Sequence, residues 1–193
     1  MSKYNKLIVF DFDGTLCHTP DQITGEKIFQ KNTGLPWPYG GWWGKSESIN
    51  PEIFDVPVNT WVYQRYLEAI ADDGAHVILA TGRLEKVLGM RNNVETILSK
   101  NNLSFDVFEL MDNIEAGTPR RSIKRNGVYL NTGGDTFYFK TKLFQELAKK
   151  LDVEEIVMYD DRHEHIIKFY EWAYEQPTKV TVVDIVNKKS RTF

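Results

Sequence analysis

The feature that most constrains the fold of this chain is a series of short apolar runs with little alternation. Runs rich in Val, Ile and Phe lie at 6–12, 76–80, 105–110, 155–159 and 180–185. Such runs are typical of parallel strands that are covered by helices on both faces. Helical patterns occupy the stretches between them, at 60–74, 84–100, 141–151 and 163–175. The alternation predicts an α/β fold, a three-layer sandwich around a central parallel sheet with right-handed crossovers.

Length and composition set broad limits on the protein. A chain of 193 residues suits one domain, here 1–193, and the net charge of -3 argues against coating nucleic acid by bulk charge. The single cysteine, Cys17, excludes an internal disulfide framework and favours a reducing compartment. Without an apolar signal segment or a membrane-length apolar window, we expect a soluble cytoplasmic protein.

Two insertions interrupt the alternation, at about 17–59 and 112–139. The first is rich in Gly, Pro and Trp ("TGLPWPYGGWWGKSESINP") and is too short for a full helical cap domain. The second contains the basic stretch "TPRRSIKR", followed by "GVYLNTGGDTFYF". We predict a hairpin over 127–139, because aromatic strand-like fragments flank a turn signal. Loops this long are usually functional in compact domains.

The first apolar run ends in "DFDGT". Asp11 and Asp13 are two residues apart, so in an extended chain both carboxylates would face one small volume. Like charges this close repel unless a cation or a shared proton compensates, and Mg²⁺ with its preference for oxygen ligands is the natural solution. Gly14 would let the chain turn sharply, and Thr15 adds a hydroxyl. The alternative is a strand-terminating Asx turn without chemistry.

The second run ends in "LATGR". Thr81, Gly82 and Arg83 would combine a hydroxyl, a free backbone and a helix N-terminus, which together form an anion site. The simpler alternative is that Thr81 caps the helix. Arg83 would either bind a substrate phosphate or pair with an acid such as Glu85.

The run at 155–159 ends in "YDDR". Asp160 and Asp161 would lie at the same sheet edge as Asp11, because ligand sites of such sheets collect at the carboxyl ends of strands. Arg162 would either reach the phosphate or brace Asp160, and we favour bracing. A positive charge would come from Lys140 or Lys142. Paired acids, a cation and a hydroxyl describe a phosphate site.

These groups predict a mechanism for a phosphate monoester. The Asp11 carboxylate would attack phosphorus and form an aspartyl-phosphate. Asp13 would protonate the leaving oxygen and later deprotonate the attacking water. Mg²⁺, Lys140 and Thr81 would offset the charge on the phosphoryl oxygens.

At these residues the chain resembles the haloacid dehalogenase (HAD) superfamily of Asp-nucleophile phosphohydrolases. "DFDGTL", "LATGR", "FK" at Phe139–Lys140 and "YDDR" resemble its four motifs in order. The resemblance implies Asp11 as nucleophile, Asp13 as acid and base, and Thr81 and Lys140 as phosphate ligands. It also implies that Mg²⁺ is held by Asp11, the Asp13 carbonyl and Asp160, with Asp161 as a second acid holding the water around the metal.

The chain is also similar to the HAD domain associated with RNA-repair proteins and to the phosphatase half of bacteriophage polynucleotide kinase/phosphatase. "GWW", "FKTKLFQEL" and "YDDRHEHIIKF" contribute to this similarity. It implies a terminal phosphate of a nucleic acid, most plausibly a 3′-phosphate, as the substrate. No Walker-type phosphate-binding motif accompanies it, so no kinase half is expected.

Two groups of residues bear on a nucleic-acid substrate. Basic side chains near aromatic rings would grip a single strand by phosphate contact and base stacking; here they are Arg120, Arg121, Lys124 and Arg125. Their alternative is a solvated charged face. Trp37, Trp42 and Trp43 would either stack on bases or fasten the first insertion to the core.

Other functions stay open at this point. The second hypothesis is a phosphatase for a nucleotide or small metabolite, and the third is a HAD fold used only as a binding module. A phosphotransferase would pass the aspartyl-phosphate to an acceptor other than water.

Overall fold

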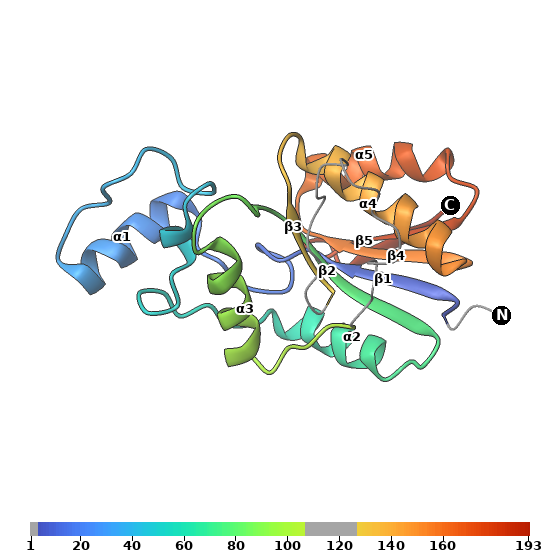
Figure 1. The fold of residues 1–193 in the computed structure, drawn as a ribbon, viewed down its shortest axis with the longest axis horizontal. Helices are drawn as coiled ribbons and strands as arrows, with labels where there is room; N and C mark the ends of the chain where they lie inside the picture. Colours follow the sequence, from blue (N-terminus) through green and yellow to red (C-terminus); the bar gives the residue numbers. More distant parts are fainter. Residues whose placement is uncertain (1–3, 107–126) are drawn as a thin grey trace, which may run out of the picture.

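The computed structural model describes residues 4–106 and 127–193, which form a six-stranded sheet in the order β3-β2-β1-β4-β5-β6 (Figure 1). The strands are β1 (Lys6–Phe10), β2 (Ala75–Leu84), β3 (Val128–Asn131), β4 (Glu155–Asp160), β5 (Lys179–Asp184) and β6 (Lys189–Thr192). All neighbouring pairs are parallel except β5 and β6. The predicted α/β fold with a largely parallel sheet is confirmed.

Helices cover both faces of the sheet. They are α1 (Gln22–Thr33), the 3-10 helix η1 (Ser46–Ile49), α2 (Thr60–Ile70), α3 (Met90–Lys100), α4 (Thr136–Leu151) and α5 (His163–Tyr174). In Figure 1, α4 and α5 lie on one face of the sheet, α2 lies on the other, and α1 extends beyond the sheet. Among the described residues, no helix combines the length and apolar character needed to cross a bilayer.

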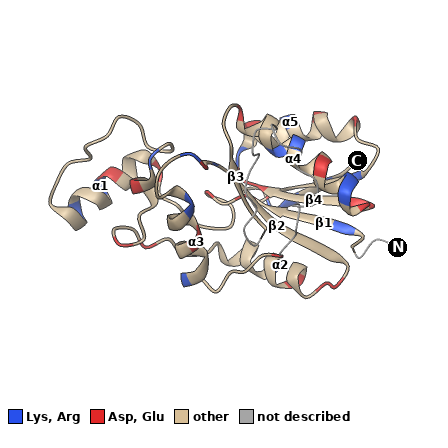
Figure 2. Cartoon of the chain, in the orientation of Figure 1, with Lys and Arg blue, Asp and Glu red and all other residues tan. Residues whose placement is uncertain are grey.

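Strand β1 supplies both hydrophobic cores, because its side chains alternate between the faces of the sheet. Ile8 and Phe10 pack in the core that contains Tyr66 of α2. Leu7 and Val9 pack in the core that contains Phe144 of α4. Figure 2 shows charged residues mainly on helices and loops, while the strands carry few. The apolar strand β1 is thus followed directly by the acidic residue Asp11.

The hairpin predicted over 127–139 is wrong. Residues 128–131 form β3, which pairs with β2, but the chain then enters α4 at Thr136. Asp135 caps this helix, its Oδ1 accepting from the Tyr138 amide at 2.8 Å. Phe137 and Phe144 recur at helical spacing and pack in the same core. Tertiary burial of one helical face therefore overrides the β propensity of the aromatic residues.

The helix predicted over 84–100 begins later than expected. Strand β2 continues through Arg83 to Leu84, and α3 starts only after Gly89, which has φ +79°. Consequently no helix N-terminus follows Thr81, so the predicted helix start is wrong, and the alternative that Thr81 caps a helix is wrong with it. Of the strand predicted at 105–110, Phe105 and Asp106 are not in a strand, and the remainder lies outside the described residues.

The first insertion contains α1 and η1 and is fastened to the core by tryptophan. Trp42 is 2% exposed, and its Nε1 donates to the Pro20 carbonyl at 2.9 Å. Trp37 packs against it with ring centroids 4.6 Å apart. This confirms the packing interpretation for both rings. Gly25 of α1 makes room for them, since a Cβ there would lie 2.1 Å from the Trp42 ring.

We expect Gly25→Ala to destabilise the protein by about 1–3 kcal/mol, because the added methyl would overpack against Trp42. Replacing a glycine inside a helix with alanine ordinarily stabilises a protein by about 0.5–1 kcal/mol. The sign of the change in the free energy of unfolding is therefore diagnostic. Urea unfolding followed by circular dichroism measures the change. Lys27→Ala, on the exposed side of α1, is the control. A Gly25→Ala variant that is as stable as the wild type would contradict this packing.

Candidate active site

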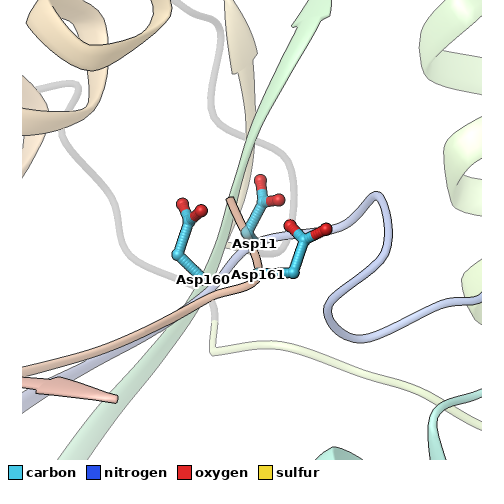
Figure 3. Close-up of side chains that lie close together, drawn as sticks. All are labelled: Asp11, Asp160 and Asp161. Atoms are coloured by element: carbon cyan, nitrogen blue, oxygen red, sulfur yellow. The ribbon is translucent and has the colours of Figure 1, made fainter. Parts of the chain in front are cut away.

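Three carboxylates meet at the carboxyl edge of the sheet. Phe10 of β1 is in register with Tyr159 of β4, so the residues that follow, Asp11 and Asp160, lie side by side. Asp161 comes next in the chain, and one ligand oxygen from each residue lies within 4.8 Å of the others. Figure 3 shows the three carboxyl groups projecting to the same side. This edge therefore concentrates negative charge in one small volume.

Lys140 compensates part of this charge. It is 2% exposed in α4, and its Nζ lies 2.8 Å from Asp11 Oδ1 and 2.7 Å from Asp160 Oδ2. Lys142 lies elsewhere, with its Nζ 5.7 Å from the centroid of the Tyr138 ring. Of the two lysines left open by the sequence, the structure places Lys140 at the carboxylates.

Burial and neighbouring charges shift the pKa values of these groups in different directions. Burial, with the charges of Asp160 and Asp13, raises the pKa of Asp11 to about 7, although Lys140 opposes the shift. For Asp160, burial is outweighed by Lys140 and His165, which together hold its pKa below the ordinary value. Burial also disfavours the charged form of Lys140, but its two carboxylate partners raise the pKa of the ammonium. Lys140 is therefore a permanent cation.

The acidic cluster fits a hard divalent cation. Oxygens bound to one Mg²⁺ at about 2.1 Å lie at most about 4.2 Å apart, so small side-chain rotations would bring these three carboxylates to it. Gly14 creates the space for Asp161: a Cβ there would lie 2.3 Å from Asp161 Oδ2. Thr15 is buried and donates to Asp161 Oδ1 at 3.2 Å, which orients the carboxylate. The site can thus hold a metal through Asp11, Asp160 and Asp161.

The spacing of Asp11 and Asp13 predicts that both carboxylates face one volume, but the Asp13 carboxylate pairs with Arg83 instead. Its carboxylate is held by Arg83, with Nη2 2.7 Å from Oδ1 and Nε 3.0 Å from Oδ2. Thr81 Oγ1 also donates to Asp13 Oδ2 at 3.4 Å. The chain leaves the extended conformation after Phe10, so the rule that residues two apart share a side no longer applies. The Asp13 side chain therefore lies beside the acidic cluster and not within it.

Arg83 links Asp13 to the first insertion. This residue is 2% exposed, and its Nη1 donates to Ser48 Oγ at 2.6 Å and to the Trp43 carbonyl at 3.0 Å. Of the two roles predicted for Arg83, pairing with an acid is the one seen, but the acid is Asp13; Glu85 pairs with Arg91 instead. Sequence reasoning missed Ser48 and Trp43 as partners, because they are 35 and 40 residues away and carry no spacing signal.

The other predicted site residues have structural contacts. Gly82 allows close packing, since a Cβ there would lie 2.9 Å from Thr136 Cγ2 of α4. The main-chain N–H of Arg162 donates to Asp160 Oδ1 at 3.0 Å, whereas its guanidinium Nη1 lies 3.3 Å from His165 Nε2, so the backbone rather than the arginine side chain braces Asp160. The basic cluster Arg120, Arg121, Lys124 and Arg125 lies outside the described residues and stays a prediction.

Because Asp11 has a pKa of about 7, protons and a divalent cation should compete for it. Below this pH the carboxyl keeps its proton, so cation binding must release it. We expect the affinity for Mg²⁺ or Mn²⁺ to be about tenfold weaker at pH 6 than at pH 8. Calorimetric titration in buffers of different ionisation enthalpy measures both the affinity and the proton release.

Asp11→Asn is the control for this titration. It should bind the cation more weakly and with a smaller pH dependence, because the amide does not titrate in this range, although burial and Asp160 still raise the pKa of Asp161. An affinity for wild-type protein that stays constant or rises as the pH falls would contradict the assignment.

Comparison with protein families gives an independent line of evidence. A family model described as HAD domain family 1 in Swiss Army Knife RNA repair proteins matches residues 29–192. The match includes Thr81, Arg83, Lys140, Asp160 and Asp161, whereas Asp11 and Asp13 precede it. Searches of curated proteins and of solved structures found no match. The family model matches most of the chain, and the α/β fold agrees with it. The chain therefore belongs to HAD domain family 1 of the Swiss Army Knife RNA repair proteins.

Proposed function

We propose that the protein is a Mg²⁺-dependent phosphohydrolase that uses Asp11 as its nucleophile and acts on a terminal phosphate of a nucleic acid. The observation that carries this proposal is the position of Asp11. Its carboxylate is in contact with the buried Lys140 cation and close to two further carboxylates able to share a metal. A metal, a cation and a nucleophilic oxygen in one volume suit phosphoryl transfer.

The chemistry divides into two steps. An Asp11 oxygen attacks phosphorus and forms a P–O bond as the bond to the leaving oxygen breaks, while Asp13 gives that oxygen a proton. Water then attacks the phosphorus of the aspartyl-phosphate and gives a proton to Asp13. The P–O bond to Asp11 breaks, so inorganic phosphate leaves and both acids return to their starting states.

The chain supplies the charge that these steps require. Asp11, Asp160 and Asp161, with the main-chain carbonyl of Asp13, would hold the cation. When bound, Mg²⁺ supplies positive charge that keeps Asp11 ionised and offsets the phosphoryl oxygens. Lys140 adds a fixed ammonium at the same place.

Arg83 is proposed as a positioning residue for Asp13. Its guanidinium makes a forked contact with the carboxylate, which fixes the plane of that group better than a single hydrogen bond would. Thr81 donates to the same carboxylate and is placed to turn its hydroxyl toward a phosphoryl oxygen. Thr15, Gly82 and Arg162 support the site through Asp161, Thr136 and Asp160.

The family and the insertions support a polymeric substrate. The family description names RNA repair proteins, which supports a nucleic acid as the substrate class. The first insertion is too short for a full helical cap domain, which suits a chain end more than an enclosed metabolite. The basic cluster Arg120, Arg121 and Arg125 stays a prediction for contacting the strand. We further propose that 1–193 acts as one domain and works in the cytoplasm, where Cys17 would remain reduced.

Replacing Asp11 should abolish the reaction. With a generic aryl phosphate and Mg²⁺, we expect Asp11→Asn to lower kcat at least about a thousandfold, because the amide cannot form the covalent intermediate. Phosphate release over time is the measurement. Asp72→Asn, an acid that pairs with Lys6 near the start of β1, is a matched control and should keep wild-type activity. If the wild type and Asp11→Asn release phosphate at equal, Mg²⁺-dependent rates, Asp11 is not the nucleophile.

A competition between substrates tests the substrate class. We expect kcat/KM for a single-stranded oligonucleotide 3′-phosphate to exceed that for the matching 3′-mononucleotide, because the polymer adds contacts outside the reacting group. Ribose and deoxyribose versions of the oligonucleotide, and its 5′-phosphate isomer, identify the preferred end. Equal or higher kcat/KM for the mononucleotides would favour the small-metabolite alternative instead.

A further inference from the structure

One tryptophan of the first insertion is not used to fasten it to the core. Trp42 is 2% exposed, whereas its neighbour Trp43 is 48% exposed. Exposing an indole to water forgoes the stabilisation that burial of its apolar surface would give. The exposed ring therefore needs an explanation that the packing of the insertion does not provide.

The position of Trp43 is fixed by the active site. Its carbonyl accepts from Arg83 Nη1 at 3.0 Å, and its ring lies 5.2 Å from Arg83 Cζ. The same guanidinium donates to the Asp13 carboxylate through Nε and Nη2. A single side chain thus separates the indole from the proposed acid and base. Arg83 covers one face of the ring, and the exposure of the residue leaves the remainder accessible.

The segment on either side of Trp43 carries an exposed aromatic ring with a lysine and a glutamate beside it. Tyr39 is 39% exposed, and Lys45 Nζ lies 5.6 Å from the centroid of its ring. The backbone beside Trp43 is open, since a Cβ at Gly41 or Gly44 would meet nothing within 4 Å. Exposed rings next to an ammonium group are the means by which proteins hold single-stranded nucleic acid without reading its sequence.

We propose that the indole of Trp43 stacks on the base of the terminal nucleotide whose phosphate is removed. This inference rests on the proposed function and adds a substrate-binding residue to it. The substrate class it selects is a phosphate ester that carries a planar base next to the phosphate. Stacking is tolerant of base identity, so Trp43 would provide affinity for any nucleotide end.

The experiment compares two oligonucleotide 3′-phosphates that differ only in the terminal residue, which is a normal nucleotide in one and abasic in the other. Trp43→Ala should raise KM for the base-bearing substrate by about 5- to 150-fold and leave KM for the abasic one unchanged. Trp43→Phe should recover most of the affinity. Neither variant removes the main-chain carbonyl that binds Arg83. Trp61→Ala, which removes another indole lying over an arginine, is the matched control and should not change the ratio of the two KM values.

A binding measurement separates this inference from the proposed function. Fluorescence anisotropy with labelled oligonucleotides and Asp11→Asn protein, with and without Trp43→Ala, reports stacking without turnover. Selective loss of base-bearing binding supports the inference, even if no hydrolysis is found. Suppose that Asp11-dependent hydrolysis occurs, but that Trp43→Ala weakens the binding of both oligonucleotides equally or of neither. The inference is then wrong and the phosphatase proposal stands. If binding of the two oligonucleotides is equal in every variant, the inference is wrong as well.

Discussion

The Lys140 ammonium, placed between Asp11 and Asp160, is the interaction on which the site depends. Moving a charged group out of water is costly, and two neighbouring carboxylates of like charge add repulsion to that cost. Lys140 reaches both with hydrogen-bond geometry from a fully buried position in α4. Without it, Asp11 and Asp160 would lose the ammonium that pairs with both of them. The helix that carries Lys140 therefore contributes to the charge balance of the candidate site as well as to the core.

Strand order explains why these groups meet. From β1 the chain adds β2 and β3 on one side of the sheet, and β4 and β5 on the other. The crevice between β1 and β4 is the point where the direction of winding reverses, and ligand sites of open α/β sheets lie at such points. Asp11 and Asp160 follow these two strands in register. Since β1 is central and supplies both cores, the proposed nucleophile follows one of the least exposed strands of the sheet.

Much of this arrangement could be predicted from the sequence, and the failures have physical causes. Unbroken apolar runs identified β1, β2, β4 and β5, and parallel pairing then required their terminal acids to meet. The choice between Lys140 and Lys142 needed the correct helix start. Once α4 begins at Thr136, Lys140 shares a helical face with Thr136 and Phe144, whereas Lys142 points away from it.

Long-range contacts were beyond sequence reasoning. The pairing of Asp13 with Arg83 joins residues 70 apart and depends on β2 continuing past Thr81, which the apolar run ending at Ala80 did not indicate. The contacts of Arg83 with Ser48 and Trp43 depend in turn on how the insertion folds back. Neither leaves a periodic or compositional trace.

The Arg83 guanidinium binds Asp13, Ser48 and the Trp43 carbonyl at once, and these contacts limit which sequences the first insertion can accept. An insertion near an active site is usually the segment most free to change between relatives. Here two acceptors from that segment help to orient Arg83 and, through it, the proposed acid Asp13, so a transplanted loop would have to reproduce both contacts to keep this arrangement. The stretch around Leu35, which is 62% exposed, makes no described contact with Arg83 or Asp13, so substitutions there would disturb the proposed site least.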